Sequence, residues 1–176
     1  MNDPDINALL STLRTDDPPV DPVVLKGVVR ELRGKSAETV TSALIEGLRD
    51  ADAEYRCTIA SVFLRVDFAT AIQHVSALLH DEDGGVQGFL CMELGAHRRR
   101  EAVPLLIDVL KRDSDGTHRV LAAWGLGNIG DPAALPVLKS AMQNDDGVDY
   151  EGRPVRDIAA EAIRRITQEK AAASVA

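Results

Sequence analysis

The stretch LAAWGLGNIGDPAALPVL, Leu121–Leu138, decides the fold, because it reads as the end of one helix, a tight break and the start of another. The small residues Ala122 and Ala123 allow a neighbouring helix to approach closely. Asp131 followed by Pro132 predicts an N-cap and a proline in the first helical turn, where a missing N–H costs nothing. A single tryptophan, Trp124, stands among these small residues, and its role is the main question that the sequence raises.

The same pattern recurs along the chain. Related helical stretches begin at positions separated by 31, 31, 32 and 37 residues, namely Val24, Tyr55, Val86, His118 and Val155. Each of the last four follows another segment with apolar residues at helical spacing: 38–48, 69–79, 101–110 and 132–142. A period near 31 residues with two helices in each copy predicts an α-solenoid, in which stacked hairpins share one continuous core.

The stretch HRVLAAWGLGNIGDPAALPVL, His118–Leu138, resembles the HEAT repeat, in the short version found in phycobilisome lyases and many bacterial proteins. The resemblance implies an all-α, right-handed α-solenoid of about five HEAT-like helical hairpins. It divides the chain into an irregular N-terminal capping repeat (1–34), four HEAT-like repeats forming one solenoid (35–168) and a flexible tail (169–176). The motif specifies architecture well and function poorly, because one fold hosts many roles.

Composition narrows the function. The 176 residues carry a formal net charge of −8, which opposes the phosphate neutralisation on which nucleic-acid binding depends. No apolar run approaches the roughly 20 residues needed to cross a membrane, and the N-terminal MNDPDINALL lacks the basic segment of a secretory signal. The only cysteines, Cys57 and Cys91, are interpreted as small buried residues in a reducing compartment. We therefore expect a cytoplasmic protein that binds neither nucleic acid nor membrane.

Trp124 is expected on the concave surface. The seventh position of each second helix should point away from the core, and this column contains two large apolar residues between polar ends: Arg30, Ser61, Met92, Trp124 and Glu161. Val120, one turn before Trp124, would share its face. We predict an apolar spot on Trp124, Met92 and Val120, bordered by Arg30, Ser61, Glu161 and Arg165. The alternative is that the helix is rotated and Trp124 fills a gap between repeats.

The acidic and basic residues near the turns have structural interpretations. Acids recur between the two helices of each pair, as at Asp50, Asp52, Asp81–Asp83, Asp113, Asp115, Asp145 and Asp146, and N-capping explains them better than a basic partner segment. The second position of each inner helix holds Arg56, Gln87, Arg119 or Arg156. In the resembled repeat this arginine pairs with acids of the neighbouring turn, so Gln87 should weaken one such link.

No catalytic residue, metal site or cofactor is expected. The four histidines are scattered over different repeats without the i, i+4 spacing of metal ligands, and no nucleophile or phosphate-loop motif occurs. The basic run His97–Arg100 is interpreted as a solvated connector. An insertion, Asp145–Pro154, lengthens the last repeat with Tyr150 and Arg153 at its tip; it is either a contact loop or a disordered connector.

These observations favour a non-enzymatic protein–protein interaction module, a scaffold or adaptor that binds a protein or peptide segment on its concave face. The alternative is a subunit similar to the bilin lyases that handle the chromophores of phycobiliproteins, with an apolar groove holding a tetrapyrrole. A third hypothesis is neutralisation of a toxin by a small acidic solenoid.

Overall fold

The computed structural model describes residues 4–14 and 20–173. Over these residues the chain is helical, and its only extended pairing is an isolated bridge between Val148 and Pro154. The prediction of an all-α solenoid is confirmed. Contacts divide the chain into an N-terminal unit, Met1–Val86, and a C-terminal unit, Gln87–Ala176.

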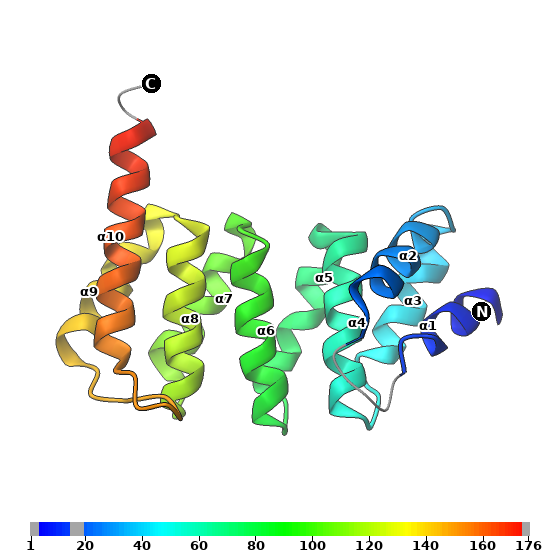
Figure 1. Ribbon diagram of the computed structural model, residues 1–176, viewed down its shortest axis with the longest axis horizontal. Helices are drawn as coiled ribbons and strands as arrows, with labels where there is room; N and C mark the ends of the chain where they lie inside the picture. Colours follow the sequence, from blue (N-terminus) through cyan, green and yellow to red (C-terminus); the bar gives the residue numbers. More distant parts are fainter. Residues whose placement is uncertain (1–3, 15–19, 174–176) are drawn as a thin grey trace. The chain divides into compact units, whose positions relative to one another are not determined.

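The N-terminal unit stacks short helices around a core that includes Leu44, Ile59 and Phe63. Both α2 and α3 contact α4, which in turn contacts α5 (Figure 1). Its elements are α1 (Pro4–Ser11), α2 (Pro22–Leu32), α3 (Ala37–Gly47), α4 (Ala53–Val66), α5 (Phe68–Val75) and the 3-10 turn η1 (Ser76–His80).

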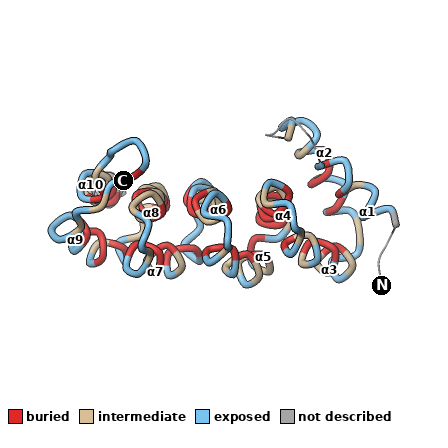
Figure 2. The backbone as a smooth tube through the Cα atoms, turned by 90° about the horizontal axis from the view of Figure 1, so that it is seen from below, coloured by how far each residue is buried: buried red, intermediate tan, exposed pale blue. Residues whose placement is uncertain are grey.

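The C-terminal unit contains most of α6 (Gly84–Ala96), which crosses the boundary between the units. Within this unit α6, α8 and α10 form one layer, and α7 and α9 form the other (Figure 2). Leu90, Leu106 and Leu126 are fully buried between the layers. The further elements are η2 (Arg100–Ala102), α7 (Val103–Arg112), α8 (Gly116–Ile129), η3 (Pro132–Ala134), α9 (Leu135–Asn144) and α10 (Val155–Ala173).

The break predicted at Gly130–Pro132 is confirmed. Gly130 ends α8 with a φ of 76°, the left-handed conformation that glycine adopts without a steric penalty. The Asp131 carboxylate accepts the N–H of Ala133 at 2.9 Å, and Pro132 begins the short 3-10 turn that leads into α9. Arg98 occupies the equivalent place after α6 with a φ of 53°, although it has a side chain.

Glycines bring the helices of the α6–α8–α10 layer close together. A Cβ atom added to Gly95 of α6 would lie 2.5 Å from the Cα of Gly125 in α8. A Cβ atom added to Gly127 of α8 would lie 2.8 Å from the Cβ of Ala162 in α10. Such distances leave no room for a side chain, so these positions fix the spacing of the three helices.

The predicted division of the chain into three segments remains a prediction. The boundaries of the capping repeat, the four-repeat segment and the tail are untested, and residues 1–3, 15–19 and 174–176 lie outside the described part of the chain. Helix α10 continues to Ala173, inside the segment interpreted as a tail. Within the described ranges, no helix combines the length and the apolar character needed to cross a membrane.

We predict that Gly95→Ala lowers the free energy of unfolding by about 1–3 kcal/mol, because the new methyl group would overlap the backbone of α8. Urea unfolding followed by circular dichroism measures the change. The matched control is Gly27→Ala in α2, where nothing lies within 4 Å of the added Cβ. This control should stabilise the helix by about 0.5–1 kcal/mol. Equal stabilities for the two variants would contradict the close approach.

Candidate binding surface

The exposed side of the α6–α8–α10 layer carries two apolar rows. The fourth position of each helix, counted from Val86, His118 and Val155, holds Phe89, Leu121 and Ile158, all partly exposed. The seventh position holds Met92, Trp124 and Glu161, and Met92 is 43% exposed. Because the helices repeat the same phase, residues at equivalent positions lie side by side across the layer. We call the five residues Phe89, Met92, Leu121, Trp124 and Ile158 the apolar face.

Trp124 is partly buried, so its position falls between the two alternatives drawn from the sequence. A Cβ atom added to Gly95 of α6 would lie 3.3 Å from the indole Cζ3, which places the ring over that glycine. On its other side the ring lines a small pocket with Ile158, Glu161 and Arg165 of α10. The indole thus fills part of the space between neighbouring helices while one portion of it remains accessible.

Two residues predicted for this surface are not on it. Val120 is only 2% exposed, so the prediction that it shares the accessible face of Trp124 is wrong. Residues three and four positions before Trp124 lie on opposite sides of it around the helix, and Leu121, rather than Val120, lies on the accessible side. Ser61, predicted as part of the polar border, is buried in the N-terminal unit, where its hydroxyl accepts a hydrogen bond from Arg65.

The other predicted border residues are accessible. Arg30 is exposed on the N-terminal unit. In the C-terminal unit Glu161 and Arg165 form an ion pair, and Arg165 Nη1 donates to Asn128 Oδ1 at 2.7 Å. These three side chains form a polar border beside Trp124. The structure therefore brings Met92, Trp124, Glu161 and Arg165 together within one unit.

The fourth-position row was missed by the sequence reasoning, although a signal for it was present. Phe89, Leu121 and Ile158 are all large and apolar, whereas the corresponding positions of the first two copies are Gly27 and Thr58. A search of every column of the repeat, rather than of the tryptophan column alone, would have found three apolar residues in successive copies.

The inner-helix arginines are structural, as predicted. Arg56 donates from Nε to Asp81 Oδ2 at 2.9 Å and from Nη2 to Asp81 Oδ1 at 2.6 Å, while its Nη1 reaches the carbonyl oxygen of Asp50 at 2.8 Å. Arg119 repeats this arrangement with Asp145 at 2.8 and 3.0 Å. Each arginine therefore ties the turn of its own hairpin to the turn of the next.

The other second-position residues depart from this arrangement. Arg156, in the last helix, pairs with the exposed Asp146 of its own loop at 2.8 Å. Gln87 cannot offer the two parallel charged donors that an arginine offers to a carboxylate. The acid of the following turn, Asp113, instead lies with its Oδ2 3.2 Å from Nδ1 of His118.

The turn acids act as caps, which confirms the structural interpretation. Asp52, Asp83 and Asp115 each accept a backbone N–H from the first turn of the following helix, at 2.9, 2.7 and 2.7 Å. The acid two residues earlier in each turn accepts the N–H of the capping aspartate, as Asp113 does from Asp115 at 2.8 Å. Each pair of acids thus closes one turn and begins one helix.

Burial and pairing shift the pKa values of these groups in opposite directions. A side-chain hydrogen bond from Arg119 is the largest influence that lowers the pKa of Asp145. For Asp81, burial raises the pKa, but the hydrogen bonds from Arg56 and from the backbone N–H of Asp83 together lower the pKa by more. The net shift of the Asp81 pKa is therefore downward. Burial raises the pKa of both Cys57 and Cys91 to about 12.

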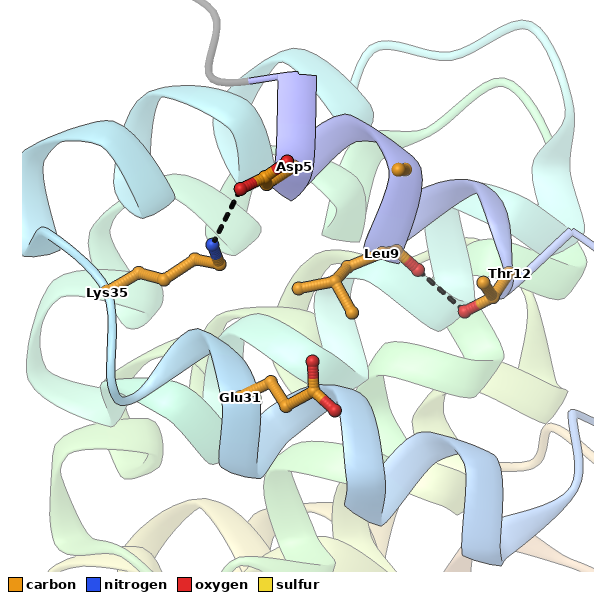
Figure 3. Close-up of a pocket in the computed structure, with 6 residues that line it drawn as sticks. Asp5, Leu9, Thr12, Glu31 and Lys35 are labelled. Carbon is orange, nitrogen blue, oxygen red and sulfur yellow. Dashed lines mark hydrogen bonds and ion pairs between the residues drawn. The ribbon is translucent and has the colours of Figure 1, made fainter.

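A cleft in the N-terminal unit combines a small apolar contact with charges of opposite sign. A cleft of about 400 Å³ lies between α1 and α2, where Lys35 Nζ is 3.9 Å from Asp5 Oδ2 and Leu9 supplies the main apolar side chain (Figure 3). Its charges of opposite sign offset each other. Among the described residues no group of three or more histidine, cysteine or acidic side chains could hold a metal ion.

Comparison with known proteins identifies the repeat. The family model for HEAT repeats matches residues 72–164, just over half of the chain. A crystal structure of an engineered protein superimposes with a TM-score of 0.51, covering 94% of this chain and 80% of that one at 20% sequence identity, a likeness that shows the fold alone. No curated protein matches significantly. The match does not distinguish the short phycobilisome-lyase version, which stays a prediction.

We predict that Asp145→Asn destabilises the protein by about 1–3 kcal/mol at pH 7, because it leaves the partly buried guanidinium of Arg119 without its charged acceptor. The folded-state pKa of Asp145 lies below its ordinary 3.8, so the ionised carboxylate stabilises the fold above that pH, and this stability is lost as the pH falls through and below 3.8. Urea unfolding at pH 7 and pH 3 should therefore differ less in the variant than in wild type. The neighbouring Asp146→Asn, whose side chain is 92% exposed, should change either value by less than about 0.5 kcal/mol.

Both thiols should react slowly in the folded protein. A pKa of about 12 leaves almost no thiolate at pH 8, and the thiolate is the form that attacks. Titration with a thiol-specific disulfide reagent should label Cys57 and Cys91 slowly in buffer and both rapidly in urea. Rapid labelling of either thiol before unfolding would contradict the shifted values.

Proposed function

Because the chain belongs to the HEAT-repeat family, we propose that it is a non-enzymatic binding module that holds a segment of a partner protein on the apolar face of its C-terminal unit. Met92, Trp124 and the fourth-position row provide the apolar contacts, and Glu161, Asn128 and Arg165 provide the polar border. The proposal covers the binding of protein or peptide only.

One observation carries this proposal: apolar side chains remain accessible at equivalent positions of three successive helices. A single exposed methionine is ordinary on a protein surface, but adjacent rows are not, because each square ångström of apolar surface left in water forgoes about 25 cal/mol. The helix backbones of the layer already meet at Gly95, Gly125 and Gly127, and the partly exposed Trp124 packs beside this contact. Aromatic residues and methionine are also frequent at the centres of protein interfaces.

The spacing of the layer suggests the form of the partner. Packed helices lie roughly 8–10 Å apart, so a segment crossing α6, α8 and α10 meets successive apolar residues at that interval. A polyproline II segment covers about 9 Å in its three-residue turn, and an α-helix covers about 10.5 Å in seven residues. We therefore propose a partner segment with apolar anchors at i and i+3 if it adopts polyproline II, or at i and i+7 if it is helical.

The other functional classes have less support. The formal net charge of −8 disfavours nucleic acid. The pocket beside Trp124 has a free volume of about 10 Å³, close to what a single water molecule requires, so it supplies no space for a bilin. Toxin neutralisation remains a hypothesis within the protein-binding class. We place the binding in the cytoplasm, in keeping with the free thiols of Cys57 and Cys91.

We predict that Met92→Glu weakens partner binding at least tenfold, because it puts a charge within the apolar face. The fold should be retained, since Met92 is 43% exposed. The matched control is Met142→Glu, because Met142 is 37% exposed on α9 in the opposite layer of the same unit. The measurement is affinity for peptides selected on the wild-type protein from a display library of random linear sequences.

Two outcomes would count against the proposal. One is a library that yields no peptide binding to the wild-type protein. The other is a selected set whose affinity falls equally for Met92→Glu and Met142→Glu. Trp124→Ala is a poorer probe, since the ring also covers Gly95 and its removal should lower stability as well as binding.

A further inference from the structure

The loop Asp145–Pro154 is an insertion that the repeat does not require. The equivalent turns at 50–52, 81–83 and 113–115 join their helices with two capping acids and one residue between them. Asp145 and Gly147 begin the same turn, but the chain then continues for several residues before α10 starts at Val155. Figure 1 shows this loop passing beneath the lower end of α8 before it returns to α10.

The insertion is organised around one buried carboxylate. The Asp149 side chain is completely buried and accepts the N–H groups of Glu151 at 3.0 Å and Arg153 at 2.8 Å. Arg153 Nε donates to its second oxygen at 2.7 Å. The backbone bridge between Val148 and Pro154 and the bond from Val155 N to Gly147 O close the base. These bonds contradict the interpretation of the insertion as a disordered connector.

The same bonds hold an aromatic ring in solvent. Tyr150 is 80% exposed, and Val148 is 50% exposed. The acidic side chains of Glu151, which follows Tyr150, and Asp146 are 51% and 92% exposed, and they form exposed ion pairs with Arg153 at 3.3 Å and Arg156 at 2.8 Å. A ring presented on an ordered loop loses little conformational freedom when a partner binds, which favours its use as a contact.

The N-terminal unit contains a site of the same chemistry that is already filled. The guanidinium carbon of Arg14 lies 3.8 Å from the centre of the Tyr55 ring, and the same guanidinium forms an ion pair with Asp50. An aromatic face and a carboxylate together therefore hold an arginine within this chain. Tyr150 and Glu151 supply the same two groups, with the ring open to solvent.

We propose that the Tyr150 loop binds an arginine or lysine side chain of the partner segment, with the cation over the ring. Its charge approaches Glu151 and Asp146, whose exposed ion pairs with Arg153 and Arg156 contribute little and can exchange for it. Val148 provides an apolar contact for the methylene groups of that side chain. The inference rests on the proposed function, because it assigns the charge of the segment that binds the apolar face. The partner is therefore a segment with apolar anchors and a basic residue beside them.

The test uses the random-peptide library on wild type and on Tyr150→Ala, with Tyr150→Phe and Met142→Glu as controls. Peptides selected on wild type should be enriched in arginine or lysine next to their apolar residues. Tyr150→Ala should bind them about fivefold to tenfold more weakly, while Tyr150→Phe, which keeps the ring, should bind them nearly as well. Replacing the basic residue by neutral citrulline should weaken wild-type binding and have little effect on Tyr150→Ala.

The outcomes separate this inference from the proposed function. The role of the loop would be overturned if the selected peptides were not enriched in arginine or lysine, or if they bound wild type and Tyr150→Ala with equal affinity. If Met92→Glu abolished binding of the same peptides, the proposed function would stand without a role for the Tyr150 loop. If no peptide bound wild type, both would fail. Circular dichroism of Tyr150→Ala should match wild type, because the exposed ring contributes little to the core.

Discussion

The contact between helix backbones at glycines is the constraint on which the candidate surface depends. With Gly95 against Gly125 and Gly127 against Ala162, the three helices of the α6–α8–α10 layer meet without intervening side chains. A large side chain therefore cannot lie between two of these helices at the contact points, although Leu94 and Leu126 beside them are buried in the core. Trp124, which precedes Gly125, lies partly over Gly95 and partly in solvent for this reason. The accessible apolar residues follow from the way in which the layer is packed.

Many acidic side chains of the described residues belong to the architecture of the chain. Asp81 and Asp145 each accept a backbone N–H in their own turn and a guanidinium from the preceding hairpin. A carboxylate that is satisfied in this way contributes little attraction for a partner. More exposed acids lie elsewhere, as Asp146 and Glu151 do in the insertion, where they form exposed ion pairs. The location of the exposed charges therefore says more about which protein segment could bind than the net charge does.

The sequence was sufficient for the fold, because the repeat period, the Gly-Asp-Pro break and the capping acids are local signals. The rotation of each helix about its axis was harder to predict than its position along the chain. Leu121 and Val120 both lie about one turn before Trp124, yet Leu121 is accessible and Val120 is buried. The insertion was beyond sequence reasoning for another reason: the burial of Asp149 depends on bonds with Glu151 and Arg153 that only the folded loop brings together. Its acidic and glycine-containing sequence is equally typical of an irregular connector.

The arginine–carboxylate links also bear on how such a chain can lengthen. The hairpin of α3 and α4 carries both a guanidinium directed to the next copy, that of Arg56, and a carboxylate that receives one from the preceding segment, that of Asp50. A duplicated gene segment that encodes one hairpin would supply both partners of every new junction, with no compensating change in its neighbours. Gln87 marks a copy in which a neutral amide replaces the guanidinium. Growth by duplication therefore tolerates the loss of this charge at one junction.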